Sequence, residues 1–264
     1  MILTRRDSML ALSAGLMAGC GGGGGAGDED RSTPLGGSWQ THSLRSRGNG
    51  TTYPLSIYLP PGSGTSSGLL PVVYLLDGES RFRTMVDVVE AQRARVIVVA
   101  IGNEAQRNRD YVPVNGCTSD GGGQAAFLDF IRLDLSPFVE ATFSADPLRR
   151  MLLGHSHGGS FVLYALFAQP AGGHHFRAYL ASDASIGCMS ATVNGWESAY
   201  AAAHTALPVR LHLAYAGNTA SMAFAATLGA RRHAGLSLAL QAYNGGHIGM
   251  IPQAFTDALA FALA

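Results

Sequence analysis

The sequence predicts an α/β fold in which a mostly parallel sheet is covered by helices on both faces. Runs with the continuous apolar pattern of buried strands, such as 70–76 and 96–101, alternate with segments of helical spacing such as 82–93. Strands that alternate with helices in this way are typical of a parallel sheet with right-handed crossovers. Apolar residues make up 47% of the 264-residue chain and charged residues only 14%, which is ample material for a core.

The expected elements begin near residue 38 with two antiparallel strands, because the Gly- and Asn-containing segment 45–50 has the composition of a hairpin turn. The other strands are identified by short apolar runs, and the helices by apolar residues at helical spacing. In chain order we expect strands at 39–44, 52–59, 70–76, 96–101, 148–153, 176–182, 209–215 and 236–243, and helices at 82–93, 124–142, 159–167, 219–233 and 252–263. The loops after these strands open at one edge of the sheet, where folds of this class place their sites.

The first 20 residues have the pattern of an export signal. The twin arginines Arg5 and Arg6 precede an apolar stretch that is too short to cross a membrane. The segment 16–20, Leu-Met-Ala-Gly-Cys, resembles a bacterial lipobox, which would make Cys20 the lipidated first residue of the mature protein. The alternative is an ordinary signal peptide that is cleaved nearby.

A glycine-rich flexible tether is expected at 21–37, and the folded domain at 38–264. The protein is therefore expected to be exported to the bacterial cell envelope, as a lipoprotein that meets the membrane only through its lipid anchor. Its 18 basic and 18 acidic residues balance, so the composition gives no electrostatic basis for binding nucleic acid.

A Gly-His-Ser-His-Gly pentapeptide at 154–158 lies between an expected strand and an expected helix. In this setting the G-x-S-x-G pattern indicates a nucleophile elbow, a strained turn that exposes the hydroxyl of Ser156 at the start of the helix. Unpaired N–H groups at that helix start can stabilise an oxyanion. A glycine-rich turn with an inert serine is the alternative interpretation.

A nucleophilic serine needs a base, and histidine suits that role near neutral pH. His155 and His157 flank the serine, but neighbours in an elbow point away from it. His247 follows the last expected strand, in the glycine-rich segment 244–249, which is where serine hydrolases of this architecture place the base. We therefore expect His247 to activate Ser156, with a surface histidine that caps a loop as the alternative.

The third member of a triad is less clearly marked. The usual position, after the strand at 209–215, carries no carboxylate and offers only Asn218, whose side-chain oxygen can orient an imidazole without an anion's charge. Asp183 follows the preceding strand and could reach the histidine from there, although an aspartate in such a turn is also a common cap. We favour Asn218, or a Ser–His dyad without an acid, over Asp183.

Two backbone N–H groups are expected to form the oxyanion hole. One belongs to His157, the residue after the nucleophile, and the other to Gly78 or Glu79 in the loop after the strand at 70–76. Such a mechanism implies no cofactor. No metal is expected either, because the histidines beside Ser156 have no matching cluster of cysteines or carboxylates in the sequence.

Two cysteines remain if Cys20 carries lipid. Cys117 and Cys188 both lie in loops expected at the same end of the sheet, and an exported protein with an even number of remaining cysteines can form one disulfide. We expect this pair to be bonded, with two free thiols as the alternative.

Five stretches match a known family in its own order: 72–78, 96–103, 107–113, 154–159 and 245–247. Through them the chain resembles the Putative esterase family of α/β-hydrolases, which includes esterases of trilactone siderophores. The resemblance implies the α/β-hydrolase fold and a carboxylic ester hydrolase with Ser156 as nucleophile and His247 as base. Two departures stand out. The turn at 217–218 lacks the acidic residue that many members carry, and 182–188 differs from the family's Ser-Pro-Ser followed by bulky aromatics.

A long polar segment at 102–123 shows little periodicity, and a loop of this length within a domain is usually functional. Its Arg107, Arg109 and Asp110 lie at the expected edge of the sheet. The arginines could hold an anionic substrate such as a ferric catecholate, whereas Arg109 and Asp110 could instead pair to stiffen the loop. We favour the structural role.

The sequence thus predicts a serine carboxylic ester hydrolase that acts through an acyl-enzyme on a small-molecule ester, of siderophore or other type. Two further functions stay open. The same chemistry with another acceptor would make the protein an acyltransferase of the cell envelope. A non-catalytic lipoprotein that binds a ligand in a relict cleft is favoured only by the missing carboxylate.

Overall fold

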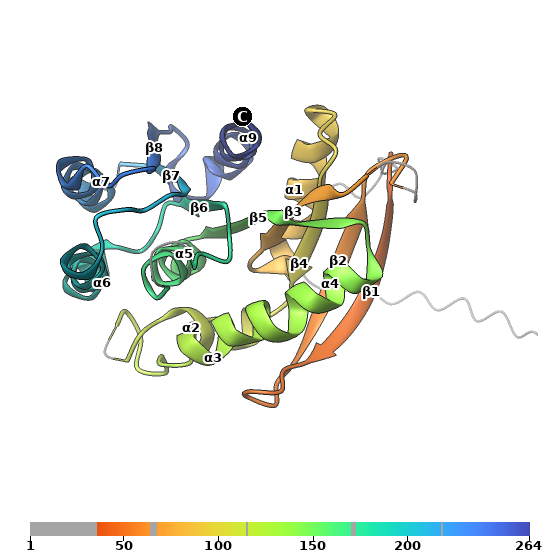
Figure 1. The fold of residues 1–264 in the computed structure, drawn as a ribbon, viewed down its shortest axis with the longest axis horizontal. Coiled ribbons are helices and arrows are strands. Elements are labelled where there is room, and N and C mark those ends of the chain that lie inside the picture. The colour runs from red at the N-terminus through yellow and green to blue at the C-terminus, as the bar shows by residue number, and fades with distance from the viewer. Residues whose placement is uncertain (1–35, 64–67, 115, 170–172, 218) are drawn as a thin grey trace, which may run out of the picture. The chain divides into compact units, whose positions relative to one another are not determined.

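The described part of the chain forms a mixed sheet of eight strands, in the order β1-β2-β4-β3-β5-β6-β7-β8 (Figure 1). The structure is a computed structural model that describes residues 36–63, 68–114, 116–169, 173–217 and 219–264. Its strands are β1 (Ser38–Arg45), β2 (Thr52–Leu59), β3 (Leu70–Leu75), β4 (Ile97–Ile101), β5 (Ala145–His155), β6 (Ala178–Ser182), β7 (Arg210–Tyr215) and β8 (Ser237–Ala242). The expected export signal, the lipidation site at Cys20, the tether up to residue 35 and Asn218 lie outside the described residues.

The strands are antiparallel at one end of the sheet and parallel through the rest. β1 pairs with β2 over a short turn that leaves Arg45 opposite Thr52, and β2 pairs antiparallel with β4. All the neighbouring pairs from β4 to β8 are parallel. This is the mostly parallel sheet that the sequence predicts, and it brings the residues that follow β3, β5, β6 and β7 to one edge.

Helices cover both faces of the sheet. α1 and α9 lie on one face, and α3, α4, α5 and α6 lie on the other (Figure 1). No helix in the described part of the chain is long and apolar enough to cross a bilayer. The α-helices are α1 (Gly78–Ala91), α2 (Arg107–Tyr111), α3 (Gln124–Asp129), α4 (Ser136–Thr142), α5 (His157–Phe167), α6 (Ser190–Ala203), α7 (Thr219–Arg231), α8 (Gly246–Gly249) and α9 (Ile251–Leu263).

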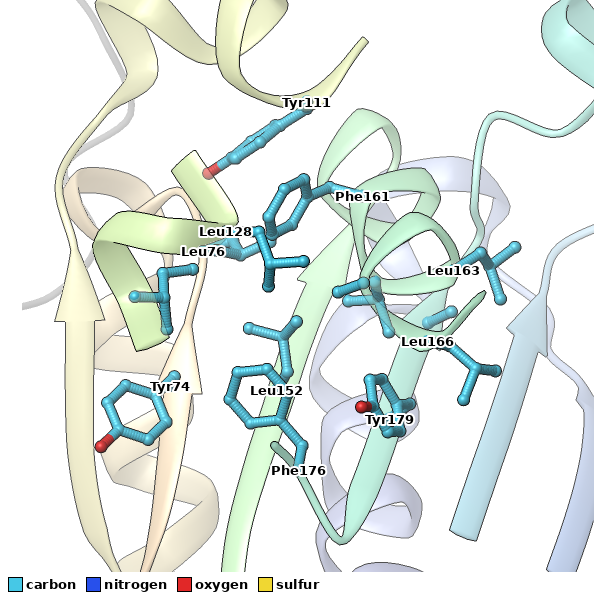
Figure 2. Close-up of a cluster of buried hydrophobic side chains, with 14 of the residues drawn as sticks. Tyr74, Leu76, Tyr111, Leu128, Leu152, Phe161, Leu163, Leu166, Phe176 and Tyr179 are labelled. Atoms are coloured by element: carbon cyan, nitrogen blue, oxygen red, sulfur yellow. The ribbon is translucent and has the colours of Figure 1, made fainter. Parts of the chain in front are cut away.

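Adjacent residues of the central strands face opposite cores. Tyr74 and Leu152 lie in the cluster that contains Phe161 of α5 (Figure 2). Their neighbours Leu75 and Leu153 belong to the second cluster, with residues of α1 and α9. A strand that is buried on both faces needs an apolar side chain at every position, which is why the sequence shows continuous apolar runs there.

Several helical segments differ from the sequence expectation. The helix expected at 124–142 is interrupted by a π-helical stretch, Phe130–Leu135, between α3 and α4. A short 3-10 helix at Glu104–Gln106 and α2 occupy part of the segment that was expected to be irregular. α6 was not expected at all, because alanine, serine, glycine and asparagine surround its buried positions Val193 and Tyr200 and weaken the apolar pattern.

Gly36 and Gly37, which the sequence assigns to the tether, contact the folded domain. The carboxylate of Glu90 on α1 accepts the backbone N–H groups of Gly36 and Gly37 at 2.6 and 3.3 Å. Gly37 is also tightly enclosed, because a Cβ built on it would lie 2.2 Å from the carbonyl oxygen of Leu59. The last two residues of the expected tether are therefore fixed to the fold.

Candidate active site

Ser156 is held in a strained turn between the end of β5 and the start of α5. Its φ and ψ are 59° and −122°, and non-glycine residues rarely adopt such a positive φ. Strand and helix approach closely here, because a Cβ built on Gly154 would lie 2.4 Å from the carbonyl oxygen of Gly158. The N–H of Ser156 donates to the carbonyl of Ser182 at 2.9 Å, which fixes the turn to β6. This geometry is that of a nucleophile elbow.

The hydroxyl of Ser156 has a second hydroxyl beside it. Its Oγ lies 3.3 Å from the Oγ of Ser185, on the loop that follows β6. The same two residues are joined along the backbone, where the N–H of Ser185 donates to the carbonyl of Ser156 at 3.2 Å. Sequence reasoning missed Ser185, whose only signal is its place two residues after Asp183.

His247 reaches the same edge of the sheet from α8. Gly245 and Gly246 precede it with φ values of 93° and 69°, so the chain turns sharply after β8. The Nδ1 of His247 lies 2.6 Å from the Oδ2 of Asp183, whose side chain is only 7% exposed. The buried carboxylate thus orients the imidazole at Nδ1, which leaves Nε2 as the ring nitrogen that can take a proton.

Asp183 is itself fixed to the neighbouring strand. Its N–H donates to the carbonyl of Ala214 at 2.8 Å, and its Oδ1 accepts the N–H of Ala216 at 3.2 Å. The carboxylate therefore comes from the loop after β6 and is hydrogen-bonded to the loop after β7. The sequence favoured Asn218 or a dyad, whereas the structure puts the carboxylate of Asp183 at Nδ1 of His247. Adjacent parallel strands end close enough for either loop to supply a histidine's partner, and Asn218 itself lies outside the described residues.

His155 is the buried last residue of β5 and lies between the proposed base and β6. Its Nδ1 is 3.1 Å from the Oγ of Ser182. Burial, helped by the charges of His247, Arg81 and Arg107, lowers the pKa of His155 to about 3. The His155 ring is therefore neutral throughout the pH range in which a serine hydrolase works.

The candidate oxyanion donors lie at two helix starts on this edge. His157 is the first residue of α5, and Gly78 and Glu79 are the first two residues of α1. The two starts are close, because a Cβ built on Gly158 would lie 3.4 Å from the Oδ2 of Asp77. N–H groups in the first turn of a helix have no partner within that helix, so both starts can donate to an oxyanion.

The side chains of two of these residues have structural partners. The carboxylate of Glu79 accepts the N–H groups of Asn103 and Glu104 at 3.1 and 3.4 Å, which ties α1 to the segment after β4. The Nδ1 of His157 lies 3.3 Å from the Oδ1 of Asn108. Burial and the charge of Arg107 lower the pKa of His157, so this ring is also neutral near pH 7.

Arg107 lies beside the site but is already engaged. Its guanidinium binds both carboxylate oxygens of Asp77 at 3.0 and 3.1 Å, and its Nη1 is 3.5 Å from the Nδ1 of His157. Asp77 has a φ of 54°, and its N–H donates to the hydroxyl of the buried Tyr111 at 3.1 Å. Arg107 therefore holds the turn between β3 and α1 in place.

Arg109 and Asp110 are paired with each other and with neighbouring side chains. Asp110 is fully buried and accepts hydrogen bonds from Arg109 at 2.8 Å, from Tyr53 at 3.1 Å and from Asn103 at 3.3 Å. The guanidinium of Arg109 also donates to Thr51 at 3.2 Å. These contacts fit the structural role favoured above, in which Arg109 and Asp110 pair to stiffen the segment.

A disulfide joins Cys117, in the segment after α2, to Cys188, in a 3-10 helix after β6. The Cα atoms of the two residues are 5.4 Å apart. Both sulfur atoms lie near the carbonyl oxygen of Ser185, at 3.9 Å for Cys117 and 3.4 Å for Cys188. The bond therefore braces the loop that carries the hydroxyl next to Ser156.

The sequence model of the Putative esterase family matches residues 46–202. The chain belongs to this family. It is 34% identical over 179 residues to the siderophore triacetylfusarinine C esterase of Aspergillus fumigatus, a match that covers 61% of this chain and 60% of that protein. It is 32% identical over 172 residues to the ferri-bacillibactin esterase BesA of Bacillus subtilis, covering 56% and 58% respectively. The chain thus spans less than two thirds of the length of these curated relatives.

Solved structures identify the fold of this esterase-family chain. An IroE-like serine hydrolase from Shewanella oneidensis superposes with a TM-score of 0.77 at 28% identity, covering 84% of this chain and 79% of that one. The BES protein from Bacillus cereus superposes with a TM-score of 0.73 at 22% identity, covering 90% and 99%. The expected α/β-hydrolase fold and the expected family are confirmed.

Proposed function

We propose that this protein is a serine ester hydrolase that works through an acyl-enzyme, with Ser156, His247 and Asp183 as its triad. The observation that carries the proposal is the 2.6 Å contact between Nδ1 of His247 and the buried carboxylate of Asp183. It lies at the same sheet edge as the strained turn that presents Ser156. A nucleophile, a base and a group that orients the base are the parts that acyl transfer needs.

In the first half of the reaction, the Oγ of Ser156 attacks the ester carbonyl carbon while Nε2 of His247 takes the hydroxyl proton. Asp183 keeps Nδ1–H of the ring in place and stabilises the imidazolium that forms. The N–H of His157 and that of Gly78 or Glu79 donate to the oxyanion. When the tetrahedral intermediate collapses, the alcohol leaves with the proton from His247, and the acyl group stays on Ser156.

The second half releases the acid. Water attacks the acyl carbon while Nε2 of His247 accepts one of its protons, and the same backbone donors hold the second oxyanion. Collapse of this intermediate returns the proton from His247 to the Oγ of Ser156. The free carboxylic acid leaves, and the site returns to its starting state.

The proposed substrate is a small-molecule ester of the siderophore type. The proposal is supported by the printed names of the relatives, which are esterases of triacetylfusarinine C and of ferri-bacillibactin. We also propose that the protein is exported and that Cys20 is lipidated, on the strength of the segment 16–20. Metabolic labelling with a fatty acid tests this, because Cys20→Ser should abolish the label on the chain.

Fluorophosphonate labelling of the full chain, read by intact mass, tests the proposed mechanism. One label per molecule is expected in the unaltered protein, and it should disappear in Ser156→Ala and slow by about 100-fold or more in His247→Ala. Ser198→Ala, on α6, is the matched control and should label fully, because the hydroxyl of Ser198 donates to Glu197 and not to the triad. A folded protein that takes no label would refute the hydrolase mechanism.

Turnover assays then separate the substrate classes. Trilactone siderophores, with and without iron, and short aryl esters are incubated with the enzyme, and the acid and alcohol products are separated by chromatography. Release of free acid from the trilactones at the higher kcat/KM supports the proposed substrate. Acyl groups that appear on an added sugar or lipid, in place of free acid, would make the protein an acyltransferase.

A further inference from the structure

Three potential metal ligands meet beside the proposed nucleophile. The sulfur atoms of Cys117 and Cys188 and a ring nitrogen of His157 all lie within 4.8 Å of one another. They come from three separate elements: the segment after α2, the 3-10 helix Gly187–Met189 and the start of α5. Two thiolates and an imidazole are a donor set that zinc and other soft divalent cations prefer.

The backbone spacing of the two cysteines suits a metal as well as a disulfide. Tetrahedral zinc with Zn–S distances of about 2.3 Å holds two sulfurs about 3.8 Å apart. Opening the bond to that separation needs side-chain rotation more than backbone movement, because the Cα atoms are already 5.4 Å apart and Cys188 is exposed. The imidazole of His157 is within ligating reach once the sulfurs separate.

We propose that Cys117, Cys188 and His157 form a redox-controlled site for one divalent cation of the zinc class. A dithiol reductant opens the site: it transfers two electrons and two protons to the disulfide, which becomes two thiols, and the reductant itself becomes a disulfide. The cation then displaces the two thiol protons and binds two thiolates and the imidazole, with water as the fourth ligand. In the reverse step a small-molecule disulfide takes two electrons from the two thiolates and becomes two thiolates itself, while the protein sulfurs join and the cation is released.

The local charges are compatible with a bound cation. Arg107, whose Nη1 lies 3.5 Å from Nδ1 of His157, is neutralised by its bidentate pair with Asp77. The two thiolates then supply a charge that matches the metal ion. The sequence analysis expected no metal, because Cys117 and Cys188 are 71 residues apart and His157 lies between them outside any metal-binding motif.

The position of the site gives it a consequence for the proposed esterase activity. The ligand His157 also provides one proposed oxyanion N–H, and the disulfide lies against Ser185, which touches Ser156. A bound cation would fix the His157 ring and the loop of Ser185 in a new arrangement. We therefore expect reduced, metal-loaded protein to turn over esters at least about tenfold more slowly, an expectation that rests on the proposed function.

The binding test does not depend on catalysis. The full chain carrying Cys20→Ser is reduced with a phosphine and titrated with Cd²⁺, and the thiolate-to-metal absorption in the ultraviolet is recorded. We expect one Cd²⁺ per reduced molecule and none for the oxidised protein. Cys117→Ser and Cys188→Ser should each abolish the one-to-one complex, and His157→Asn should weaken it by about tenfold or more. His204→Asn, on a histidine at the end of α6, is the matched control.

A second readout excludes binding to unfolded chains. Zn²⁺ should raise the Tm of the reduced protein and leave that of the oxidised protein unchanged, because a ligand that binds the folded state stabilises it. Equal Cd²⁺ affinity in His157→Asn, or a Tm that Zn²⁺ does not raise, would overturn the site. If Zn²⁺ binds but ester turnover is unchanged, the inhibitory role is overturned while the site stands. A protein that binds Cd²⁺ as expected but hydrolyses no ester refutes only the proposed function.

Discussion

The imidazole of His155 lies against that of His247, with ring centroids 4.4 Å apart and planes inclined by 41°. His247 is therefore held from two directions, by the carboxylate of Asp183 at Nδ1 and by a ring against its face. Because His155 is buried and its pKa is lowered to about 3, the supporting ring stays neutral when His247 becomes protonated. A neutral ring can support the base without repelling the imidazolium.

Replacing His155 tests whether this ring positions the base. We expect His155→Ala to lower kcat by about tenfold or more with little change in KM, because the imidazole of His247 then gains freedom to leave its productive orientation. His155→Phe keeps an aromatic face and should recover most of that loss. Steady-state kinetics on an aryl ester measure both variants. A phenylalanine variant as slow as the alanine variant would argue against a positioning role for the ring.

The identity of the acid is tested by two substitutions made in parallel. Asp183→Asn keeps the shape of the side chain but removes the charge that stabilises the imidazolium, so kcat should fall by about 100- to 10,000-fold. Asn218→Ala should change kcat by less than about twofold. Steady-state kinetics of both variants on one ester decide which residue orients His247. A large loss of kcat in Asn218→Ala with little change in Asp183→Asn would identify Asn218 as that residue.

The elements and the elbow could be predicted because their signals are local. The continuous apolar runs reflect strands buried on both faces, and the glycines around Ser156 reflect a strand and a helix that cross too closely for a Cβ on Gly154. The same holds for His247, whose glycine-rich turn directly follows the last strand. Each of these features is encoded by a few residues that are adjacent in the sequence.

The acid and the surroundings of the nucleophile depend on contacts that no local pattern encodes. Asp183 and His247 are 64 residues apart, and their contact depends on how β6, β7 and β8 end relative to one another. The contact of Ser185 with Ser156 is equally remote. α6 was missed for another reason, since its small residues carry a weak apolar pattern although Val193 is fully buried.

The buried network of Asp110 predicts a loss of stability without a loss of substrate binding. Asp110→Asn removes the charge that Arg109, Tyr53 and Asn103 surround, which should lower the free energy of unfolding by about 2–3 kcal/mol. Its KM should stay within about twofold of the unaltered enzyme. Urea unfolding measures the change, and Asp87→Asn, in an exposed pair on α1, is the control expected to cost less than about 1 kcal/mol. A rise in KM with an unchanged free energy of unfolding would indicate instead that Asp110 contributes to substrate binding.

Buried histidines predict that the fold loses stability as the pH falls below about 6.5. Burial lowers the pKa of His212, in β7, to about 4, with Asp257 opposing the shift. Between these two pH values the unfolded chain binds a proton that the folded protein does not, so lowering the pH favours unfolding. Burial lowers the pKa of His155 and His175 in the same direction, to about 3 for each.

His212→Phe isolates the contribution of one ring. Phenylalanine does not titrate, and the buried His212 already lies near the ring of Phe261. Integrating the proton uptake of one histidine from about pH 7 to about pH 5 gives a difference of about 2 kcal/mol, so the variant should lose that much less stability over this interval. Urea unfolding at the two pH values measures it. If the free energy of unfolding falls equally in the variant and in the unaltered protein between the two pH values, His212 takes up its proton within the folded state.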